Sequence, residues 1–520
     1  TAQAHARKAA ENARSLIEQV RRRDNAIDTL DALLRQYSLD TEEGLMLMCL
    51  AEALLRDPPP GLLDAVPAYG VLYLEYDPRR LSRGRLLRLL RGLPPERAEE
   101  GRVVEIPVRY DGEDLPEVAS RLGLSLEAVK ALHQKPLYRV YALGFTPGFP
   151  FLAEVEPALR LPRKPHPRPR VPAHAVAVAG VQTGIYPLPS PGGWNLIGTS
   201  LVAVYDPHRE TPFLLRPGDR VRFLEAEGPT PPEPRPLELL PEEPRLPALL
   251  VEEPGLLDLV VDGGRFLGGH LGLARSGPLD APSARLANRL VGNGAGAPLL
   301  EFAYKGPVLT ALRDLVAAFA GYGFVALLEG EEIPPGQSFL WPRGKTLRFR
   351  PRGPGVRGYL AVAGGLEVRP FLGSASPDLR GRIGRPLRAG DVLGLEALRP
   401  VRPGRAFPQR PLPEAFRLRL LPGPQFAGEA FRALCSGPFR VARADRVGVE
   451  LLGPEVPGGE GLSEPTPLGG VQVPPSGRPL VLLADKGSLG GYAKPALVDP
   501  RDLWLLGQVR PGVEIYFTSG

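Results

Sequence analysis

Apolar residues recur at helical spacing through the first 57 residues of the chain. This segment contains no proline and only one glycine, and its apolar positions lie three and four residues apart in two runs. The second run begins after Asp40 and Glu43, whose spacing is typical of a capping box at the start of a helix. We therefore predict a helical hairpin over residues 1–57. Its apolar positions are Leu16, Ile17, Val20, Ile27, Leu30, Leu33 and Leu34 in the first helix, and Leu45, Leu47, Leu50 and Leu54 in the second.

Beyond Pro58 the pattern changes to the short apolar runs and turns of β-strands. The first three predicted strands are residues 71–76, 103–108 and 137–143. Between the last two, residues 114–133 predict two short helices separated by Gly123, an arrangement like a helix-turn-helix. The second helix carries Lys130 but no Arg, Asn or Gln to read base edges. A packed helical hairpin is therefore favoured over a DNA-reading motif.

A turn followed by a short alternating strand recurs four times along the chain. The best example is Arg216-Pro-Gly-Asp-Arg-Val-Arg-Phe223, and related segments lie at residues 343–349, 388–393 and 510–517. Such repetition predicts related β lobes on both sides of residues 228–247. That stretch holds eight prolines, and we expect it to be a semi-rigid linker.

Composition supports a β-rich chain. The 63 prolines and 61 glycines follow no regular period, which favours many short elements joined by turns. The net charge of +6 comes from basic residues mixed with acidic ones, so we expect no nucleic-acid partner. Only 8 of the 64 basic residues are lysine. Arginine suits two-pronged contacts to carboxylate or phosphate, but genome composition or a hot habitat explains its excess equally well.

The two cysteines and the apolar runs bear on the cellular compartment of the protein and on whether it spans a membrane. Cys49 and Cys435 lie far apart in sequence, which argues against a disulfide framework or a structural zinc site. The longest apolar run, residues 315–328, contains two glycines and is too short to cross a bilayer. No signal-peptide pattern opens the chain. We expect a cytoplasmic protein without a membrane partner.

The richest candidate site lies between Gly144 and Gly198. Familiar zinc, dithiol and serine-hydrolase motifs are absent, and Gly344-Lys-Thr346 lacks the leading glycine of a phosphate-binding loop. Glycines allow backbone amides to approach a ligand, prolines stiffen the loops, and three arginines supply charge. The segment is therefore a candidate site for a small anion, with barrel corners as the alternative. The candidate binding residues are Arg163, Arg168, Arg170, Gln182, Thr183, Tyr186, Ser190, Gly192, Gly193 and the apolar wall Trp194.

Motifs between Gly144 and Tyr492 follow the same order as those of a known family, and together the matches cover about residues 58–520. Gly144-Phe-Thr-Pro-Gly-Phe-Pro-Phe-Leu152 and residues 180–198 resemble the B subunit of bacterial ATP-dependent 5-oxoprolinase. Asp262-Gly-Gly-Arg-Phe-Leu-Gly-Gly-His270 and Asp485-Lys-Gly-Ser-Leu-Gly-Gly-Tyr492 resemble the C subunit of the same enzyme, and Lys486 stands where that family usually has Arg. Further matches to the C subunit lie at residues 276–280, 359–365, 445–448 and 469–474. The same family includes the Kip-type inhibitor of a sporulation histidine kinase and the carboxyltransferase domain of urea carboxylase, related to allophanate hydrolase subunits 1 and 2.

The resemblance implies a mainly β fold with some α structure, made of tandem cyclophilin-like β barrels. The domains expected from it are a helical segment (1–57), a small α/β domain without its usual first strand and helix (58–100), a B-like barrel (101–227), the linker (228–247) and two lobes of a C-like module (248–400 and 401–520). Separately, residues 15–56 resemble the helical arm of bifunctional proline utilisation proteins, for example in Tyr37-Ser-Leu-Asp-Thr-Glu-Glu-Gly44. None of the catalytic domains of those proteins follows.

The resemblance also implies a reaction, in which ATP drives the opening of 5-oxoproline to glutamate in a complex with the separate A subunit of 5-oxoprolinase. ATP and Mg²⁺ are then the expected cofactors, and homo-oligomerisation stays open. Phosphorylating the lactam oxygen would give a better electrophile, and arginines and backbone amides would stabilise the developing charge. Beyond the arginines and amides already named, the candidate binding residues are Arg265, Arg446 and Lys486. The candidates for proton transfer or Mg²⁺ contact are His270, Asp280, Asp445 and Asp485, although a capped turn is an equally good role for each Asp.

Two other functions compete with this one. A Kip-type regulator would bind and inhibit a histidine kinase, and a urea amidolyase-related enzyme would transfer a carboxyl group from biotin. The chain has no Met-Lys-Met biotin attachment signal, since both methionines precede residue 50. Carboxyl transfer would therefore require a separate biotin carrier.

Overall fold

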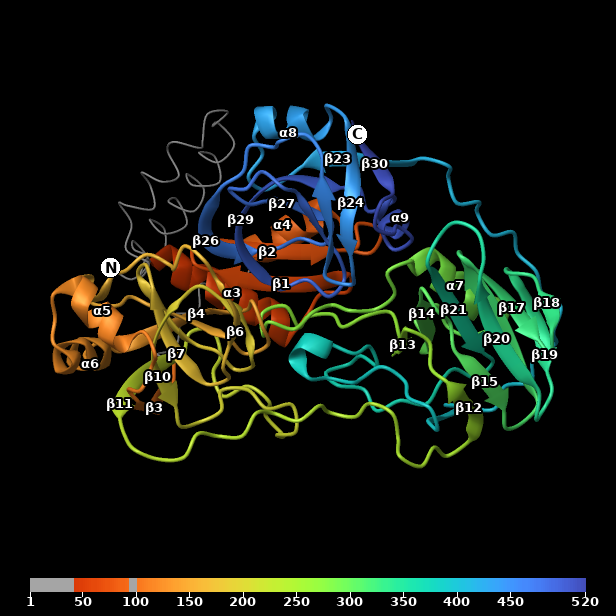
Figure 1. The fold of residues 1–520 in the computed structure, drawn as a ribbon, viewed down its shortest axis with the longest axis horizontal. Coiled ribbons are helices and arrows are strands. Elements are labelled where there is room, and N and C mark those ends of the chain that lie inside the picture. Colours follow the sequence, from red (N-terminus) through yellow and green to blue (C-terminus); the bar gives the residue numbers. More distant parts are fainter. Residues whose placement is uncertain (1–41, 93–100) are drawn as a thin grey trace.

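The computed structural model describes residues 42–92 and 101–520, which form a small central unit, two β barrels and a β sandwich (Figure 1). The small unit contains helices α3 (Glu42–Arg56) and α4 (Arg83–Gly92) and an antiparallel hairpin of β1 (Leu62–Ala68) and β2 (Val71–Tyr76). Its own core includes Leu54, Leu62 and Leu86. The second helix of the predicted hairpin is therefore present as α3. The first helix and the proposed cap at Asp40 lie outside the described residues.

The amino-terminal barrel closes through seven strands. They are β3 (Val103–Arg109), β4 (Tyr138–Leu143), β5 (Pro150–Ala153), β7 (Ala175–Ala179), β8 (Gln182–Ile185), β10 (Asn195–Ser200) and β11 (Arg220–Glu225). A separate ribbon pairs β6 (Arg168–Val171) with β9 (Ser190–Gly192). The last barrel strand, β11, runs parallel to the first, β3.

Two helices cover one end of this barrel (Figure 1). They are α5 (Leu115–Leu122) and α6 (Leu126–Gln134), and Gly123 separates them with a φ of 66°. The Ser125 hydroxyl accepts a hydrogen bond from Ala128 N at 3.1 Å and caps α6. Val118 and Val129 pack into the barrel core. The predicted packed hairpin is therefore confirmed.

The β sandwich follows in sequence and consists of two sheets and one helix. The first sheet contains β12 (Pro247–Glu253), β15 (Val308–Ala311), β17 (Phe324–Leu328), β18 (Glu331–Ile333), β20 (Thr346–Pro351) and β22 (Val392–Gly394). The second contains β13 (Leu257–Val261), β14 (Leu299–Ala303), β16 (Leu315–Gly321), β19 (Gln337–Trp341) and β21 (Arg357–Val362). A core around Phe302, Phe319 and Trp341 fills the space between them. Helix α7 (Ala281–Leu290) covers the outer face of the second sheet.

The carboxy-terminal barrel repeats the closure of the first. Pairing of β23 with β29 closes seven strands, and β26 adds to β29 from outside. Its first and last strands are again parallel neighbours. The strands are β23 (Phe416–Pro422), β24 (Pro438–Ala444), β25 (Gly448–Leu452), β26 (Glu460–Pro465), β27 (Gly470–Val473), β28 (Leu480–Leu482), β29 (Leu489–Val498) and β30 (Glu514–Ser519). The helices are α8 (Gly428–Leu434) and α9 (Leu503–Leu506).

The recurring turn and strand of the sequence occupy equivalent places in the fold. The four segments lead into β11, β20, β22 and β30, and β11 and β30 are the last strands of the two barrels, each parallel to its barrel's first strand. In two of the turns an aspartate accepts the backbone amide of the arginine three residues earlier, at 2.9 Å for Asp219 and 2.7 Å for Asp391. The predicted mainly β fold with tandem barrels is confirmed.

The proline-rich stretch runs along the surface between the amino-terminal barrel and the sandwich (Figure 1). Leu237 pairs with Ile383, and Leu239 is buried beside Leu273 and Phe371. The stretch is thus attached to the sandwich side of the molecule at these points. The domain boundaries drawn from the sequence stay a prediction. In the described part of the chain, no helix is long and apolar enough to cross a membrane.

Candidate functional site

The loop of residues 267–276 joins three parts of the molecule through backbone hydrogen bonds. Leu267 N donates to Leu63 O in the small unit at 3.0 Å. Gly148 N in the amino-terminal barrel donates to Leu271 O at 2.9 Å, and Ser276 N donates to Ala484 O in the carboxy-terminal barrel at 3.0 Å. Strand β1 itself lies against β4 and β26. The motifs singled out in both halves of the sequence therefore meet at one junction.

Glycines make this close meeting feasible. A Cβ atom on Gly272 would lie 2.6 Å from Thr146 O, and one on Gly144 would lie 2.3 Å from the side chain of Leu489. Such distances are shorter than any normal contact, so a larger residue would push the loops apart. The glycines of the motifs thus serve the packing of the three parts against one another.

A pocket lies at this junction, and we call it the Lys486 pocket. It is narrow, and the roughly 350 Å³ of empty space around its lining includes open solvent at the mouth. It is lined by Asp64, Val66, Tyr73 and Glu75 of the small unit, Gly269, Leu273 and Arg275 of the 267–276 loop, and Thr466, Leu468, Lys486 and Ser488 of the carboxy-terminal barrel.

Arg275 and Glu75 form an ion pair in one wall of the pocket. An Nη of Arg275 lies 2.6 Å from Glu75 Oε1, and the Tyr73 hydroxyl donates to Glu75 Oε2 at 3.1 Å. Both charged side chains are largely buried, with exposed fractions of 18% and 25%. Their charges neutralise each other. This wall is therefore polar but carries no net charge.

Lys486 and Asp64 are the other charged groups of the pocket. Lys486 Nζ donates to Thr466 Oγ1 at 3.2 Å. Burial lowers the pKa of Lys486 to about 8, against the opposing influence of Glu75 and Asp64. Burial also raises the pKa of Asp64, against the influence of Arg275 and Lys486. An amine that titrates near neutrality can bind an anion or exchange a proton.

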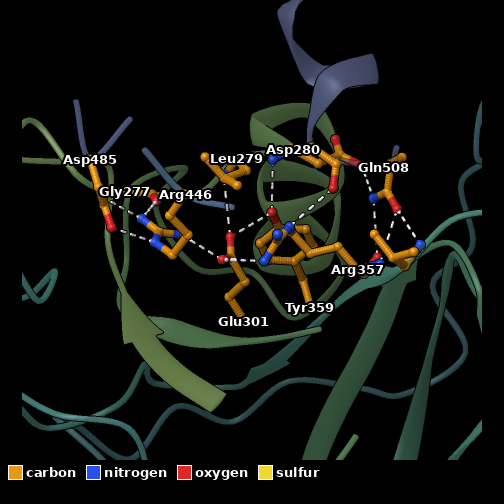
Figure 2. A network of polar contacts seen from close by, with 11 residues as sticks. Gly277, Leu279, Asp280, Glu301, Arg357, Tyr359, Arg446, Asp485 and Gln508 are labelled. Carbon is orange, nitrogen blue, oxygen red and sulfur yellow. Dashed lines mark hydrogen bonds and ion pairs between the residues drawn. The ribbon is translucent and has the colours of Figure 1, made fainter. Parts of the chain in front are cut away.

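A network of buried polar contacts holds the residue before Lys486 (Figure 2). Asp485 Oδ2 and Oδ1 accept hydrogen bonds from Nε and Nη2 of Arg446, at 2.8 and 3.0 Å. Nη2 also donates to Gly277 O at 2.7 Å, and Nη1 lies 2.5 Å from Glu301 Oε1. Burial alone would lower the pKa of Arg446, but the carboxylates of Asp485 and Glu301 raise it. The guanidinium therefore stays charged and fixes both acids.

Glu301 joins the sandwich to the carboxy-terminal barrel. Only 1% of the residue is exposed, and besides Arg446 it binds Arg357 at 2.9 Å and the Tyr359 hydroxyl at 2.7 Å. Burial opposes ionisation, but the two arginines bring the pKa of Glu301 below its ordinary value. Leu279 N donates to the same carboxylate at 3.1 Å. A fully satisfied carboxylate of this kind fixes the relative position of the two parts.

Asp280 extends this network to helix α7 (Figure 2). Its carboxylate accepts from Ser283 N at 3.0 Å and caps the helix, and Gln508 Nε2 donates to it at 2.8 Å. Asp445, by contrast, lies at a turn, where Oδ1 accepts from Val447 N at 2.8 Å and Gly448 N at 3.0 Å. Both aspartates thus have capping contacts, and their proposed roles in proton transfer stay predictions.

His270 and Arg265 come from the same loop region but not from the wall of the Lys486 pocket. Burial lowers the pKa of His270 to about 4, and its Nδ1 has no hydrogen-bond partner among the described residues. Arg265 is 2% exposed, and it donates to Phe371 O at 3.1 Å and Ser376 O at 2.8 Å. The catalytic and binding roles expected of these two residues stay predictions.

Thr183 and Gln182 of the 182–194 segment face opposite sides of strand β8, Thr183 towards the interior of the amino-terminal barrel and Gln182 towards the small unit. Thr183 Oγ1 donates to Ala177 O at 2.9 Å, so it accepts from His133 Nε2, which lies 2.9 Å away. Gln182 contacts the Tyr69 hydroxyl of the small unit. A Cβ on Gly192 would lie 2.3 Å from the hydroxyl of Tyr186. These contacts account for the residue types of the loop through packing and hydrogen bonding.

Trp194, Ser190 and Gly193 are the remaining candidate binding residues of this segment. The ring of Trp194 packs edge-on against Phe149 and Phe151 in the cluster that also contains Tyr186. Ser190 is buried on β9, and its hydroxyl has no partner in the described part of the structure. Gly193 O accepts from Lys164 N at 2.7 Å. Their binding roles stay predictions.

The three arginines expected to bind an anion are each paired with acids. Arg163 lies 2.6 Å from Glu460 in the carboxy-terminal barrel, and Arg170 lies 3.4 Å from Glu233. Arg168 lies 2.5 Å from Asp114, a buried carboxylate at the start of α5. Since each has a different partner, the structure does not bring these three guanidinium groups to one point.

Sequence reasoning missed most of the Lys486 pocket. Lys486 was singled out, but Asp64, Glu75, Thr466 and Ser488 were not. Asp64 and Glu75 lie opposite each other on the two strands of the β1–β2 hairpin. The first strand was not predicted, because residues 62–68 show no regular alternation of apolar and polar residues. An acid on each strand of a predicted hairpin would have been the available signal. In residues 42–92 and 101–520, no group of three or more His, Cys, Asp or Glu side chains could hold a metal ion.

Comparison with known proteins gives the family. The model of carboxyltransferase domain subdomains C and D matches residues 30–215, and the model of subdomains A and B matches residues 271–519. The crystal structure of TTHA0988 superposes with a TM-score of 0.92 and 96% identity, over 93% of this chain and 98% of that one. The chain is thus a carboxyltransferase-domain protein with both pairs of subdomains.

Two curated relatives show which carboxyltransferase-domain proteins this chain is related to. The 5-oxoprolinase B subunit of Escherichia coli O157:H7 is 43% identical over 32% of this chain and 78% of its own length. The 5-oxoprolinase C subunit of Escherichia coli K12 is 34% identical over 50% of this chain and 87% of its own length. Urea amidolyase of Saccharomyces cerevisiae is 34% identical over 48% of this chain but only 15% of its own length. The chain belongs to the family of the B and C subunits of 5-oxoprolinase, joined in one polypeptide.

Proposed function

We propose that this chain is the combined B and C component of an ATP-dependent 5-oxoprolinase, which opens 5-oxoproline to glutamate together with a separate A subunit. The observation that carries the proposal is the junction itself. Motifs of the B-like and C-like halves contact each other through the 267–276 loop, and the Lys486 pocket lies beside that contact. A site built from both halves would explain why the B and C subunits work together.

The chemistry requires activation of a stable amide. Transfer of the γ-phosphoryl group of ATP to the lactam oxygen leaves ADP and makes the ring carbon a better electrophile. Water adds to that carbon and the C–N bond breaks, with a proton passing to the nitrogen, which gives γ-glutamyl phosphate. A second water then releases inorganic phosphate and glutamate. ATP is consumed as a substrate of the complex. The described residues offer no group of three or more His, Cys, Asp or Glu side chains that could hold a metal ion, so Mg²⁺ has no assigned place in this chain. The residues of this chain would bind and orient the small substrate.

The test is glutamate release from 5-oxoproline by the full chain mixed with ATP and the A subunit. Release that requires both proteins and ATP would support the proposal. A preparation of the A subunit that is active with known B and C subunits serves as the positive control. If that preparation releases no glutamate with this chain, the proposal is wrong. We also propose a cytoplasmic location, because a reducing compartment suits a chain whose only two cysteines, Cys49 and Cys435, lie far apart in sequence.

A second candidate function is carboxyl transfer, which the similarity to urea amidolyase favours. The chain would then accept a carboxyl group from a separate biotin carrier. Incorporation of labelled bicarbonate into a small amide, dependent on this chain and on a carboxylated carrier protein, would support that function. If the chain is a carboxyltransferase of this kind, glutamate release from 5-oxoproline should stay at background.

A further inference from the structure

We propose that the Lys486 pocket binds 5-oxoproline, with the ammonium of Lys486 binding the substrate carboxylate and the carboxylate of Asp64 accepting the lactam N–H. The inference rests on the proposed function and adds the place and the residues of substrate binding.

Lys486 has donors left for a ligand. An ammonium group carries three N–H donors, and the structure gives Lys486 one hydrogen bond, to Thr466 Oγ1 at 3.2 Å. None of the carboxylates in the described residues lies within ion-pair distance of its Nζ atom. A partly buried cation without a paired anion favours an anionic ligand.

Asp64 supplies the complementary group. Its Oδ1 accepts the neighbouring amide of Ala65 at 2.9 Å, and none of the described basic residues forms an ion pair with it. Gly269 lies so close that a Cβ there would be 2.4 Å from Asp64 Oδ2. This carboxylate is thus held beside the pocket with acceptor capacity that the surrounding protein leaves unused.

The remaining charges narrow the class of ligand. Glu75 is paired with Arg275 and also accepts a hydrogen bond from Tyr73, so Lys486 and Asp64 are the charged groups lining the pocket that have no ion-pair partner among the described residues. They match a small molecule that carries an anion and an N–H donor side by side. In 5-oxoproline the carboxylate is attached to the carbon next to the lactam nitrogen, and this is the required arrangement.

Ser488 is an independent indication of a polar ligand. The residue lines the pocket with 4% of its surface exposed, and its Oγ has no hydrogen-bond partner among the described residues. A buried hydroxyl without a hydrogen-bond partner is unfavourable. A ligand with a lactam oxygen or a carboxylate would supply the missing acceptor.

The experiment is equilibrium dialysis of radiolabelled 5-oxoproline against the full chain, with and without the A subunit. Lys486→Met should weaken binding by about ten-fold or more, since it removes a charge-assisted contact. Lys486→Arg should restore binding to within about three-fold, because it keeps the positive charge. Lys345→Met removes an exposed lysine far from the pocket and is the matched control.

A ligand variant isolates the contact itself. Pyrrolidin-2-one has the same ring without the carboxylate, so Lys486→Met should leave its competition unchanged. Asp64→Leu should weaken both compounds, whereas Asp64→Asn keeps an acceptor and should lose less. Equal binding of 5-oxoproline by the original chain and Lys486→Met would overturn the inference. So would the absence of binding by the original chain both alone and in the presence of its partner.

The assay also separates this inference from the proposed function. Binding that depends on Lys486 without glutamate release would refute the function and leave the binding assignment in place. Glutamate release with an unchanged KM for 5-oxoproline in Lys486→Met would support the proposed function and refute the binding assignment. Thermal unfolding of each variant checks that the fold is retained.

Discussion

Arg446 holds Asp485 by two parallel hydrogen bonds, of 2.8 and 3.0 Å, and Asp485 directly precedes the pocket lysine Lys486. The same guanidinium reaches Glu301 of the sandwich. The position of the pocket wall is therefore fixed by a buried contact between two parts of the C-like half. Arg446, Asp485 and Glu301 act on the pocket as positioning residues in this arrangement.

Arg446→Met should lower the free energy of unfolding by about 3–5 kcal/mol, because it leaves two buried carboxylates without this cation. Urea unfolding followed by tryptophan fluorescence measures the loss. Arg443→Met is the control, since Arg443 is 67% exposed and its acids lie 3.8 and 3.9 Å away; its effect should stay below about 1 kcal/mol. Similar losses in the two variants would show that the buried network contributes little.

Gly269→Ala should impair the Lys486 pocket. The added methyl group would meet Asp64 Oδ2 at 2.4 Å and Val66 Cγ2 at 2.8 Å, so the loop or Asp64 must move. We expect binding of 5-oxoproline to weaken by about ten-fold, as a displaced acceptor loses its hydrogen bond. Gly294→Ala is the matched control, because a Cβ there meets nothing within 4 Å. Unchanged binding in Gly269→Ala would contradict a role for Asp64.

Binding of 5-oxoproline should depend on pH through Lys486. Its pKa of about 8 means that the amine is charged below pH 8 and neutral above it. Affinity should thus be constant near neutrality and fall about ten-fold per pH unit well above pH 8. Lys486→Arg should abolish this decline, since arginine stays protonated. The dissociation constant measured from about pH 6 to pH 10 checks the prediction, and a decline shared by the arginine variant would contradict it.

His133 should make the amino-terminal barrel sensitive to acid. It is fully buried between the Tyr110 hydroxyl at 2.8 Å and Thr183 Oγ1 at 2.9 Å, and burial lowers its pKa to about 3. In the unfolded chain the His133 ring takes up a proton near pH 6.5, whereas in the folded chain it does so only near pH 3. The free energy of unfolding therefore falls as the pH drops from about 6.5 towards 3. The slope for this group is about 1.4 kcal/mol per pH unit.

His133→Gln should reduce that slope by the same amount, as measured by urea unfolding at several pH values. His166→Gln replaces an exposed histidine and should leave the slope unchanged. An acid response of His133→Gln equal to that of the original chain would show that other groups cause the destabilisation.

Local patterns in the sequence determined many of the elements. The predicted strand at residues 71–76 coincides with β2, and the Gly123 break separates α5 from α6. The recurring turns lead into four strands, two of which are the last strands of the barrels. Periodicity, caps and turn residues act over only a few positions, so these features can be predicted without the tertiary structure. Motif order was likewise enough to give the family.

Only the tertiary structure decided which of these residues face one another. Asp64 and Lys486 lie near opposite ends of the chain, and they meet because β1 packs against β26 and the 267–276 loop binds three parts at once. The tertiary structure also pairs Arg163, Arg168 and Arg170, which are close in sequence, with three different acids. Burial, desolvation and charge pairing depend on long-range packing, so the sequence supplied the charged residues while the fold determined which charges remain available to a ligand.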